Sequence, residues 1–214
     1  MTYADEVDAF PLKGNKTLFN ISLNSCKGHI IFSTATIDRE LNDILKKRIY
    51  KKVELNVRPS FKPLAIPKII LLPQIFIYLY LFFLLKNIER QCIIFVSSKK
   101  QCQILYNIYS RLFSCTYVYS DLDSRNENIS NFRNQKYQFI ISTTVLERGI
   151  TIKNIDVIII DIGDVFDESN LIQMLGRIGR GIDNNYGDAY LLANKNNKKI
   201  TNTINYLRKA NSYL

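Results

Sequence analysis

The sequence predicts an α/β fold in which helices cover both faces of a parallel sheet. Short apolar runs, rich in β-branched residues, recur along the second half of the chain; they span residues 92–96, 116–119, 137–142, 155–160 and 187–192. Segments with a helical spacing of apolar residues lie between them. Hydrophobic residues make up 47% of the 214 residues, which is enough for a sizeable core. Strands that alternate with helices in this way imply βαβ units.

The chain before this alternation is less regular. Residues 38–50 predict a helix because their apolar residues are spaced for one helical face. Residues 52–57 alternate as a strand would, and residues 58–67 contain prolines and predict an extended connection. Residues 74–90 predict a helix that is apolar on most sides.

The helices of the second half follow their strands directly. Serines stand immediately before residues 99–112 and are suited to cap a helix there. Residues 123–135 predict a polar helix with few apolar anchors, and residues 168–178 predict a helix that ends at glycines. Residues 198–214 predict the last helix. In such folds ligands bind at the carboxyl ends of the strands.

The excess of basic residues indicates which class of partner the chain binds. Lys and Arg number 29 against 19 Asp and Glu, so the formal net charge is +10. This balance favours a polyanionic partner, nucleic acid first and an anionic membrane second. Four dispersed cysteines form no C-x-x-C pair, so no zinc site is expected, and we expect reduced, buried thiols in a cytoplasmic protein.

The start of the chain has neither the basic region nor the apolar region of a signal peptide. Residues 69–85 are strongly apolar, but Pro73 and Gln74 interrupt them. The uninterrupted run that remains, residues 75–85, is too short to span a bilayer and predicts a buried helix.

An acidic cluster near the N-terminus is the first candidate site. Asp5, Glu6 and Asp8 place three carboxylates within four positions. Carboxylates can hold Mg²⁺ together with substrate phosphates, and a neighbouring Glu can orient a water for attack on a phosphoryl group. A solvated acidic N-terminus explains the same residues, so both interpretations stay open at this point.

The segment 173–180, Q-M-L-G-R-I-G-R, is more specific. On a helix, Gln173 and Arg177 are four residues apart and share a face, with Arg180 near it. Arginines beside glycines suit a polyphosphate that approaches closely, because the guanidinium group binds phosphate oxygens in bidentate fashion.

Hydroxyl residues follow two of the apolar runs. Thr143 and Thr144 come after residues 137–142, and Ser33 and Thr34 come after an Ile-Ile-Phe run. Hydroxyls and backbone amides at such turns can bind phosphates, although ordinary helix capping also explains them.

The order of these segments carries a resemblance. D-E-x-D, S-T-A-T, T-T-x-x-x-x-G and Q-x-x-G-R-x-G-R resemble motifs II, III, V and VI of superfamily 2 helicases, with residues 92–98 similar to motif IV. The DEVDAFP box at residues 5–11 and TTVLERGIT at residues 143–151 resemble the ComFA family of late-competence DNA-uptake ATPases. Residues 58–67 look like a degraded form of another segment of that family.

The resemblance implies roles for single residues. Asp5 would coordinate Mg²⁺, Glu6 would activate the hydrolytic water, and Arg180 would be the better candidate for an arginine finger. The other implied roles are a nucleotide-facing position for Gly149, Gln173 and Arg177, contact with the DNA backbone for Ser97, Thr143 and Thr144, and coupling of ATP state to domain movement for Asp8, Ser33 and Thr34.

The resemblance also implies an architecture. Residues 1–50 would be a remnant of a first RecA-like domain that carries motifs II and III. Residues 51–214 would be a second RecA-like domain, the helicase C-terminal domain, with motifs IV, V and VI. The implied function is the C-terminal portion of an ATP-dependent translocase that draws single-stranded DNA into the cell.

The sequence departs from that family in one decisive feature. No G-x-x-x-x-G-K-[ST] loop occurs, so the segment that cradles the β- and γ-phosphates is absent from these residues. ATP and Mg²⁺ are therefore expected as cofactors only together with a P-loop domain, upstream in cis or supplied in trans. The alternatives are a stand-alone module that binds nucleic acid or a protein partner, and a decayed, non-functional fragment. The expected location is cytoplasmic, at the inner face of the membrane beside the DNA-uptake machinery.

Overall fold

The computed structural model describes residues 1–5, 7, 15–34, 43, 51–55, 62–146, 152–161, 165–179 and 187–214. The chain divides into two compact units, Met1–Glu54 and Leu55–Leu214. The interpretation of the first unit as a remnant of a RecA-like domain stays a prediction.

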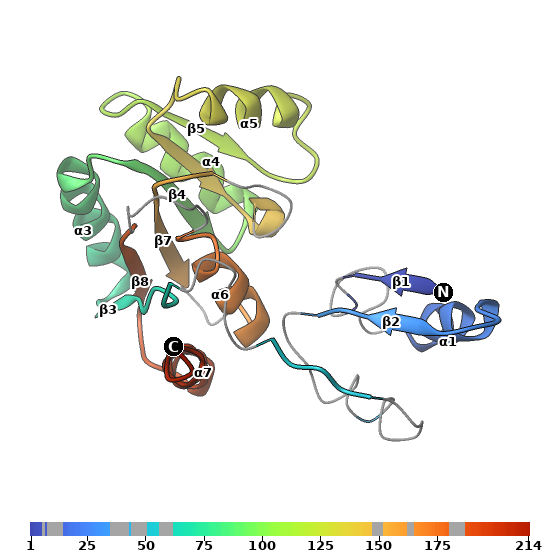
Figure 1. Cartoon of the computed structure of the whole chain (residues 1–214). Helices are drawn as coiled ribbons and strands as arrows, with labels where there is room; N and C mark the ends of the chain where they lie inside the picture. Colours follow the sequence, from blue (N-terminus) through green and yellow to red (C-terminus); the bar gives the residue numbers. More distant parts are fainter. Residues whose placement is uncertain are drawn as a thin grey trace. The chain divides into compact units, whose positions relative to one another are not determined.

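The second unit is built on a six-stranded sheet in which every pairing is parallel (Figure 1). The strand order is β3-β8-β7-β4-β6-β5. The strands are β3 (Lys68–Leu71), β4 (Gln91–Val96), β5 (Cys115–Val118), β6 (Phe139–Ser142), β7 (Ile155–Asp161) and β8 (Ala189–Ala193). The predicted α/β class with a parallel sheet is confirmed.

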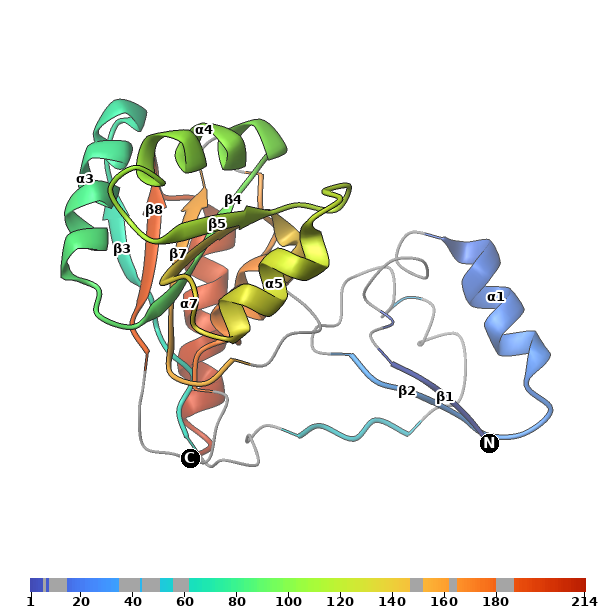
Figure 2. The same cartoon turned by 90° about the horizontal axis from the view of Figure 1, so that it is seen from above.

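Helices cover both faces of this sheet, as Figure 2 shows from a second direction. One face packs against α3 (Gln74–Asn87) and α4 (Lys99–Tyr109). The other face packs against α5 (Arg125–Arg133), α6 (Glu168–Leu175) and α7 (Lys198–Asn211). Each predicted helix of the second half is present, and its ends differ from the prediction by a few residues.

The alternation of side chains along each strand produces two cores. In β4, Ile93 and Phe95 face the α5–α6–α7 layer, whereas Cys92, Ile94 and Val96 face the α3–α4 layer. A strand that is buried on both faces is a continuous apolar run, which explains why the sequence predicts these strands clearly.

α3 is buried on one face only, which corrects the prediction of a buried helix. Ile77 and Leu81 are fully buried, but Ile75 remains 76% exposed and Leu79 and Phe83 each 54%. The reason is that α3 lies over the β3–β8 end of the sheet and has a layer to pack against on one side. A run that is apolar on most sides does not indicate which side is buried. Among the described residues no helix is long and apolar enough to cross a membrane.

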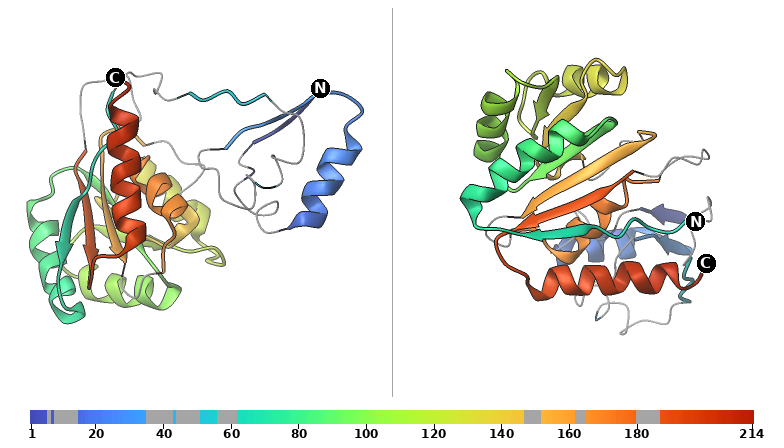
Figure 3. Two further views of the ribbon diagram at one scale, coloured as in Figure 1. Left: turned by 90° about the horizontal axis from the view of Figure 1, so that it is seen from below. Right: turned by 90° about the vertical axis from the view of Figure 1, so that its left-hand side faces the viewer.

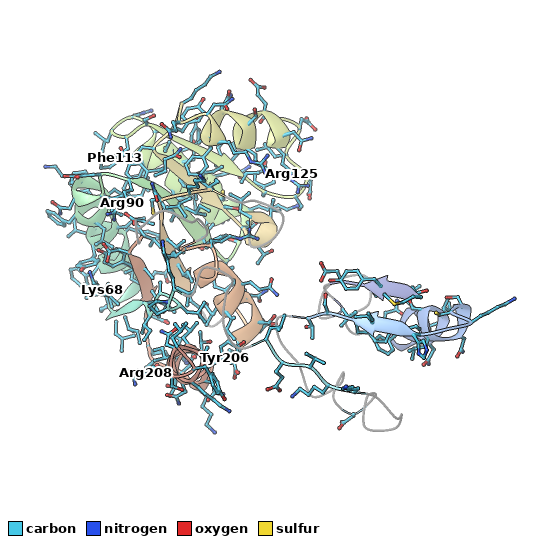
Figure 4. The ribbon with its side chains drawn as sticks, in the orientation of Figure 1. Lys68, Arg90, Phe113, Arg125, Tyr206 and Arg208 are labelled. Atoms are coloured by element: carbon cyan, nitrogen blue, oxygen red, sulfur yellow. The ribbon has the colours of Figure 1, made fainter. Side chains whose placement is uncertain are left out.

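The last helix, α7, runs beside α6 (Figure 3) and presents a polar outer face. Tyr206 and Arg208 lie on this helix and are exposed (Figure 4). Ile200, Ile204 and Leu207 are buried on its inner face, which is the helical spacing that the sequence predicts.

The predicted strand over residues 52–57 is wrong for its described part. Lys52–Leu55 has no regular secondary structure, although Lys52 and Glu54 form an ion pair. Val53 is 74% and Leu55 91% exposed, so no partner buries the alternating apolar residues. Alternation forms a strand only where a neighbouring strand pairs with it. The helix predicted over residues 38–50 lies outside the described residues except for Asp43.

The first unit holds β1 (Thr2–Ala4), α1 (Lys16–Ser25) and β2 (Ile30–Phe32). β1 pairs with β2 in parallel, with Tyr3 opposite Ile31. Phe19 of α1 stacks on Phe32 at 5.2 Å between ring centroids and is 3% exposed. The sequence did not predict α1.

Gly187 leads into β8 and has very tight surroundings. A Cβ atom built there would lie 1.8 Å from the backbone oxygen of Ile155. We expect Gly187→Ala to lower the free energy of unfolding by about 2–3 kcal/mol, because backbone has to move to admit the methyl group. Urea denaturation followed by circular dichroism measures it. Gly28→Ala is the control, since nothing lies within 4 Å of the added Cβ; equal stability of the two variants would contradict the expectation.

The four cysteines differ in reactivity for a physical reason. Burial raises the pKa of the Cys102 thiol to about 12 and that of Cys115 to about 11, and it raises the pKa of Cys92 well above its usual value. Hydrogen bonds from the Thr2 hydroxyl and the Gly28 backbone lower the pKa of Cys26. We expect one fast-reacting thiol in the native chain, faster as the pH rises, when an aromatic disulfide reagent is added. Cys26→Ala should remove that phase; a fast phase that persists in this variant would refute the assignment.

Candidate functional site

The carboxyl ends of β4, β5 and β6 meet at one edge of the sheet. Phe95 in β4 pairs with Ser142 in β6, and Val118 in β5 pairs with the same residue. Because the strands are parallel and in register, the segments that start at Ser97, Tyr119 and Thr143 leave the sheet side by side. The Thr143 N–H donates to the Val118 carbonyl at 3.4 Å, which holds two of these segments together.

Ser97 directly follows β4 and is fixed by a glutamine from the next helix. Its backbone N–H and its hydroxyl both donate to Oε1 of Gln101, at 3.2 and 3.0 Å. Gln101 is 8% exposed, and its amide nitrogen donates to the Tyr78 hydroxyl of α3 at 3.4 Å. Two donors of Ser97 thus converge on a single oxygen of Gln101, which fixes the residue at the end of β4.

Gln101 was missed in the sequence, although a signal for it exists. Ser98 caps α4 by accepting the Gln101 N–H at 3.2 Å, and Gln101 reaches back toward the start of the helix. A Ser followed three residues later by Gln is the spacing of a capping box. The difference here is that the glutamine reaches one residue further back, to Ser97.

Thr143 and Thr144 follow β6 at the start of a short 3₁₀ helix, Thr144–Leu146. Thr143 is half-buried and Thr144 is exposed, while Leu146 anchors the turn in the core. The structure therefore brings Ser97, Thr143 and Thr144 together at one edge, as the nucleic-acid hypothesis requires. Gly149 lies outside the described residues.

Asp161 holds the backbone just before α6 and is a second residue that the sequence interpretation missed. Asp161 ends β7, is 2% exposed, and accepts the N–H groups of Val165 and Phe166 at 3.0 and 3.4 Å through Oδ1. Asp167 then caps α6 in a capping box with Asn170. The available signal was a carboxylate at the end of an otherwise apolar strand, because a buried carboxylate requires hydrogen-bond donors.

The predicted shared helix face of Gln173 and Arg177 is wrong, because α6 ends at Leu175. Beyond it the Arg177 N–H donates to Met174 and the Ile178 N–H to Leu175, which are the bonds of a tighter turn. Gly179 has φ 72°, a left-handed conformation that favours glycine and ends the turn.

The side chains of this segment are nevertheless positioned firmly. Arg177 is 4% exposed, and Gln173 donates from its amide to Ser169 Oγ at 3.2 Å. A guanidinium group buried to this extent has lost most of its water and needs protein partners or an anion. Arg180 lies outside the described residues.

In the first unit the structure joins the two predicted motifs. Asp5 directly follows β1 and Ser33 directly follows β2, and the Ser33 hydroxyl donates to Asp5 Oδ1. The Ser33 N–H donates to the Ala4 carbonyl at 2.9 Å, and the Val7 N–H donates to the Ser33 carbonyl at 3.2 Å. The hydroxyls of Ser33 and Tyr3 are 3.0 Å apart.

This geometry fits one part of the predicted Mg²⁺ site. Asp5 is an exposed carboxylate held by a hydroxyl, and oxygen ligands of this kind suit Mg²⁺. The other two residues of the acidic cluster, Glu6 and Asp8, lie outside the described residues. Thr34, the other coupling candidate, is half-buried beside Ser33.

Comparison with curated proteins finds relatives along nearly the whole chain. The chain is 35% identical to the competence protein ComFA of Streptococcus pneumoniae over 97% of its own length and 52% of that protein. It is 27% identical to ComFA of Bacillus subtilis over 82% of its length and 41% of the relative. The chain thus spans about half the length of these relatives, and its resemblance to ComFA is confirmed.

Solved structures support the fold. A Saccharomyces cerevisiae Dbp5 structure, bound to RNA and ADP BeF3, superposes with a TM-score of 0.70 at 20% identity, over 99% of this chain and 57% of the other. The C-terminal domain of the DEAD-box protein Dbp5 matches with a TM-score of 0.54 at 24% identity, over 71% of this chain and 88% of the other.

The family model described as the helicase conserved C-terminal domain matches residues 68–181. The match begins at β3 and ends just after residues 173–180, which we call the Gly-Arg segment. That range holds the parallel strands β3 to β7, the converging edge at Ser97 and Thr143, and the buried Arg177. The chain belongs to the helicase conserved C-terminal domain family, within superfamily 2.

Proposed function

We propose that this chain is the C-terminal portion of an ATP-driven translocase that moves single-stranded DNA into the cell during competence. The similarity to two competence proteins and membership of the helicase C-terminal family support the proposal. One observation of the structure carries it furthest: the parallel register gathers Ser97, Thr143 and Thr144 at one edge of the sheet.

The proposed role of that edge is to bind the sugar–phosphate backbone. Hydroxyls and backbone N–H groups contact phosphates without regard to base sequence, which suits a protein that moves along DNA. The exposed position of Thr144, next to the half-buried Thr143, supports this role. The net charge of +10 favours the approach of a polyanion.

The proposed role of the Gly-Arg segment is to complete a nucleotide site. MgATP, when bound by a P-loop domain, supplies the phosphoryl group that is transferred to water. Arg177 and Arg180 would stabilise the negative charge that develops on the γ-phosphate, and Gln173 and Gly149 would line the same site. Arg180 is the better candidate for the arginine finger, and Arg177, which is 4% exposed, would be its neighbour.

The first unit would contribute the metal and water chemistry of the same reaction. Asp5 would hold Mg²⁺, and Glu6 would orient and deprotonate the attacking water. Asp8, Ser33 and Thr34 would couple the state of the nucleotide to movement, and the bond from Ser33 to Asp5 supports such coupling. We further propose a cytoplasmic location and a partnership with membrane-associated uptake machinery.

A stand-alone binding module is the second candidate function. The observation that favours it is that the proposed DNA-binding residues Ser97, Thr143 and Thr144 all lie within the second compact unit. The two candidates differ in turnover of ATP and agree in binding of DNA, so two separate measurements are needed.

The DNA-binding edge is tested by removing one hydroxyl. We expect Thr144→Val, which preserves the shape of the side chain, to weaken binding of a fluorescent oligo(dT) about five- to ten-fold in anisotropy titrations at low salt, because one hydrogen bond to a phosphate is lost. Thr201→Val on α7 is the matched control, since Thr201 is also exposed and its hydroxyl donates to the Asn197 carbonyl at the start of its own helix. Equal affinities of the two variants would remove Thr144 from the interface.

The nucleotide role is tested by phosphate release in the presence of single-stranded DNA. We expect no turnover from the chain alone and clear turnover after the P-loop portion of a ComFA relative is added. Arg180→Ala should then reduce the rate by about three orders of magnitude or more, as expected for loss of an arginine finger. Turnover by the chain alone, or an unchanged rate in Arg180→Ala, would defeat the proposed nucleotide site. DNA binding without turnover in any combination would favour the stand-alone module.

A further inference from the structure

Three tyrosines form a row of neighbouring, mutually tilted rings beside β5. Tyr106 of α4 lies 4.5 Å from Tyr117 of β5, and Tyr117 lies 5.9 Å from Tyr119, between ring centroids. All three are partly exposed. We call these three residues the tyrosine row; it lies on the α3–α4 side of the sheet, at the outer strand.

Tyr119 ends the row at the edge where the DNA-binding residues gather. It directly follows β5, and its neighbour Val118 accepts the hydrogen bond from the Thr143 N–H. Its hydroxyl accepts a hydrogen bond from Gln103 Nε2 at 3.2 Å, which fixes the orientation of the ring. An oriented aromatic ring therefore stands next to the proposed contacts with the DNA backbone.

One cation lies at this ring: the Lys99 ammonium, two residues after Ser97, is 5.7 Å from the centroid of Tyr119. The next residue, Lys100, is exposed, and Arg125 (labelled in Figure 4) is the exposed first residue of α5. Lys99 also pairs with Asp121, but both side chains are at least half exposed, so this ion pair contributes little and a phosphate can compete for the lysine.

We propose that Tyr119 and Lys99 form a base-stacking site that binds one unpaired nucleobase and its adjoining phosphate. The site extends the backbone contacts of the proposed DNA-binding edge, and it therefore rests on the proposed function. Tyrosine rings stack on any base and hence give affinity without sequence preference, while the lysine neutralises the phosphate. A duplex cannot use this site, because its bases are already stacked.

The absence of tryptophan from the sequence makes a direct test available. Tyr119→Trp creates a single fluorescent reporter, which is titrated with oligo(dT) and with an abasic oligonucleotide of equal length. We expect oligo(dT) to quench the fluorescence and the abasic strand to leave it unchanged. Tyr206→Trp, on the exposed face of α7, is the control and should respond to neither strand. Equal quenching of Tyr119→Trp by both strands would overturn base stacking.

Binding affinities for the two strands distinguish the stacking site from the proposed DNA-binding edge on which it rests. Tyr119→Ala should weaken binding of oligo(dT) about ten-fold and leave binding of the abasic strand unchanged. Asp121→Asn, which releases Lys99, should tighten binding of both. If the wild-type protein binds both strands with equal affinity and Tyr119→Ala has the same affinities, the stacking site is rejected and the DNA-binding edge is retained. If the wild-type protein binds neither strand, both proposals are rejected. Circular dichroism of each variant verifies the fold, and the Trp variant carries the test should Tyr119→Ala be unfolded.

Discussion

The pairing of β4 with β6 on one side and β7 on the other is the constraint on which the second unit depends. β4 is central, its residues Cys92 to Val96 are at most 1% exposed, and both pairings are parallel and in register. A strand buried on both faces can tolerate neither a shift in register nor a polar side chain in its middle. Because this register is set, the ends of β5, β6 and β7 are set with it.

That constraint explains why the candidate chemistry lies at the ends of strands and not along them. Ser97, Tyr119, Thr143 and Asp161 each lie at the carboxyl end of a strand or immediately after it. There the backbone leaves the ladder, and its polar groups need other partners. Gln101 satisfies Ser97, and Asp161 accepts the Val165 and Phe166 N–H groups before α6. An exposed hydroxyl at the same kind of position, that of Thr144, is suited to bind phosphate.

Burial assigns different roles to similar residues. Arg177 is almost completely buried, while Lys99 and Arg125 are exposed at the sheet edge. A buried guanidinium group keeps a fixed position and stabilises charge over a short distance, whereas exposed cations attract a polyanion and exchange partners easily. This difference in burial agrees with the proposed nucleotide role of Arg177 and the proposed DNA-binding role of Lys99.

The sequence by itself determined the alternation of strands and helices, because strands buried on both faces and amphipathic helices have distinct periods, as in β4, β7 and α7. It also located the hydroxyl turns and the Gly-Arg segment. Only the tertiary structure decided that residues 52–55 form no strand, that α3 is exposed on one face, and that α6 ends before Arg177. The reach of Gln101 back to Ser97 and the row of tyrosines likewise became visible only in space. The reason is physical: periodicity reports which residues can be buried together, whereas pairing partners, helix ends and contacts between strand ends depend on what the rest of the chain places beside them.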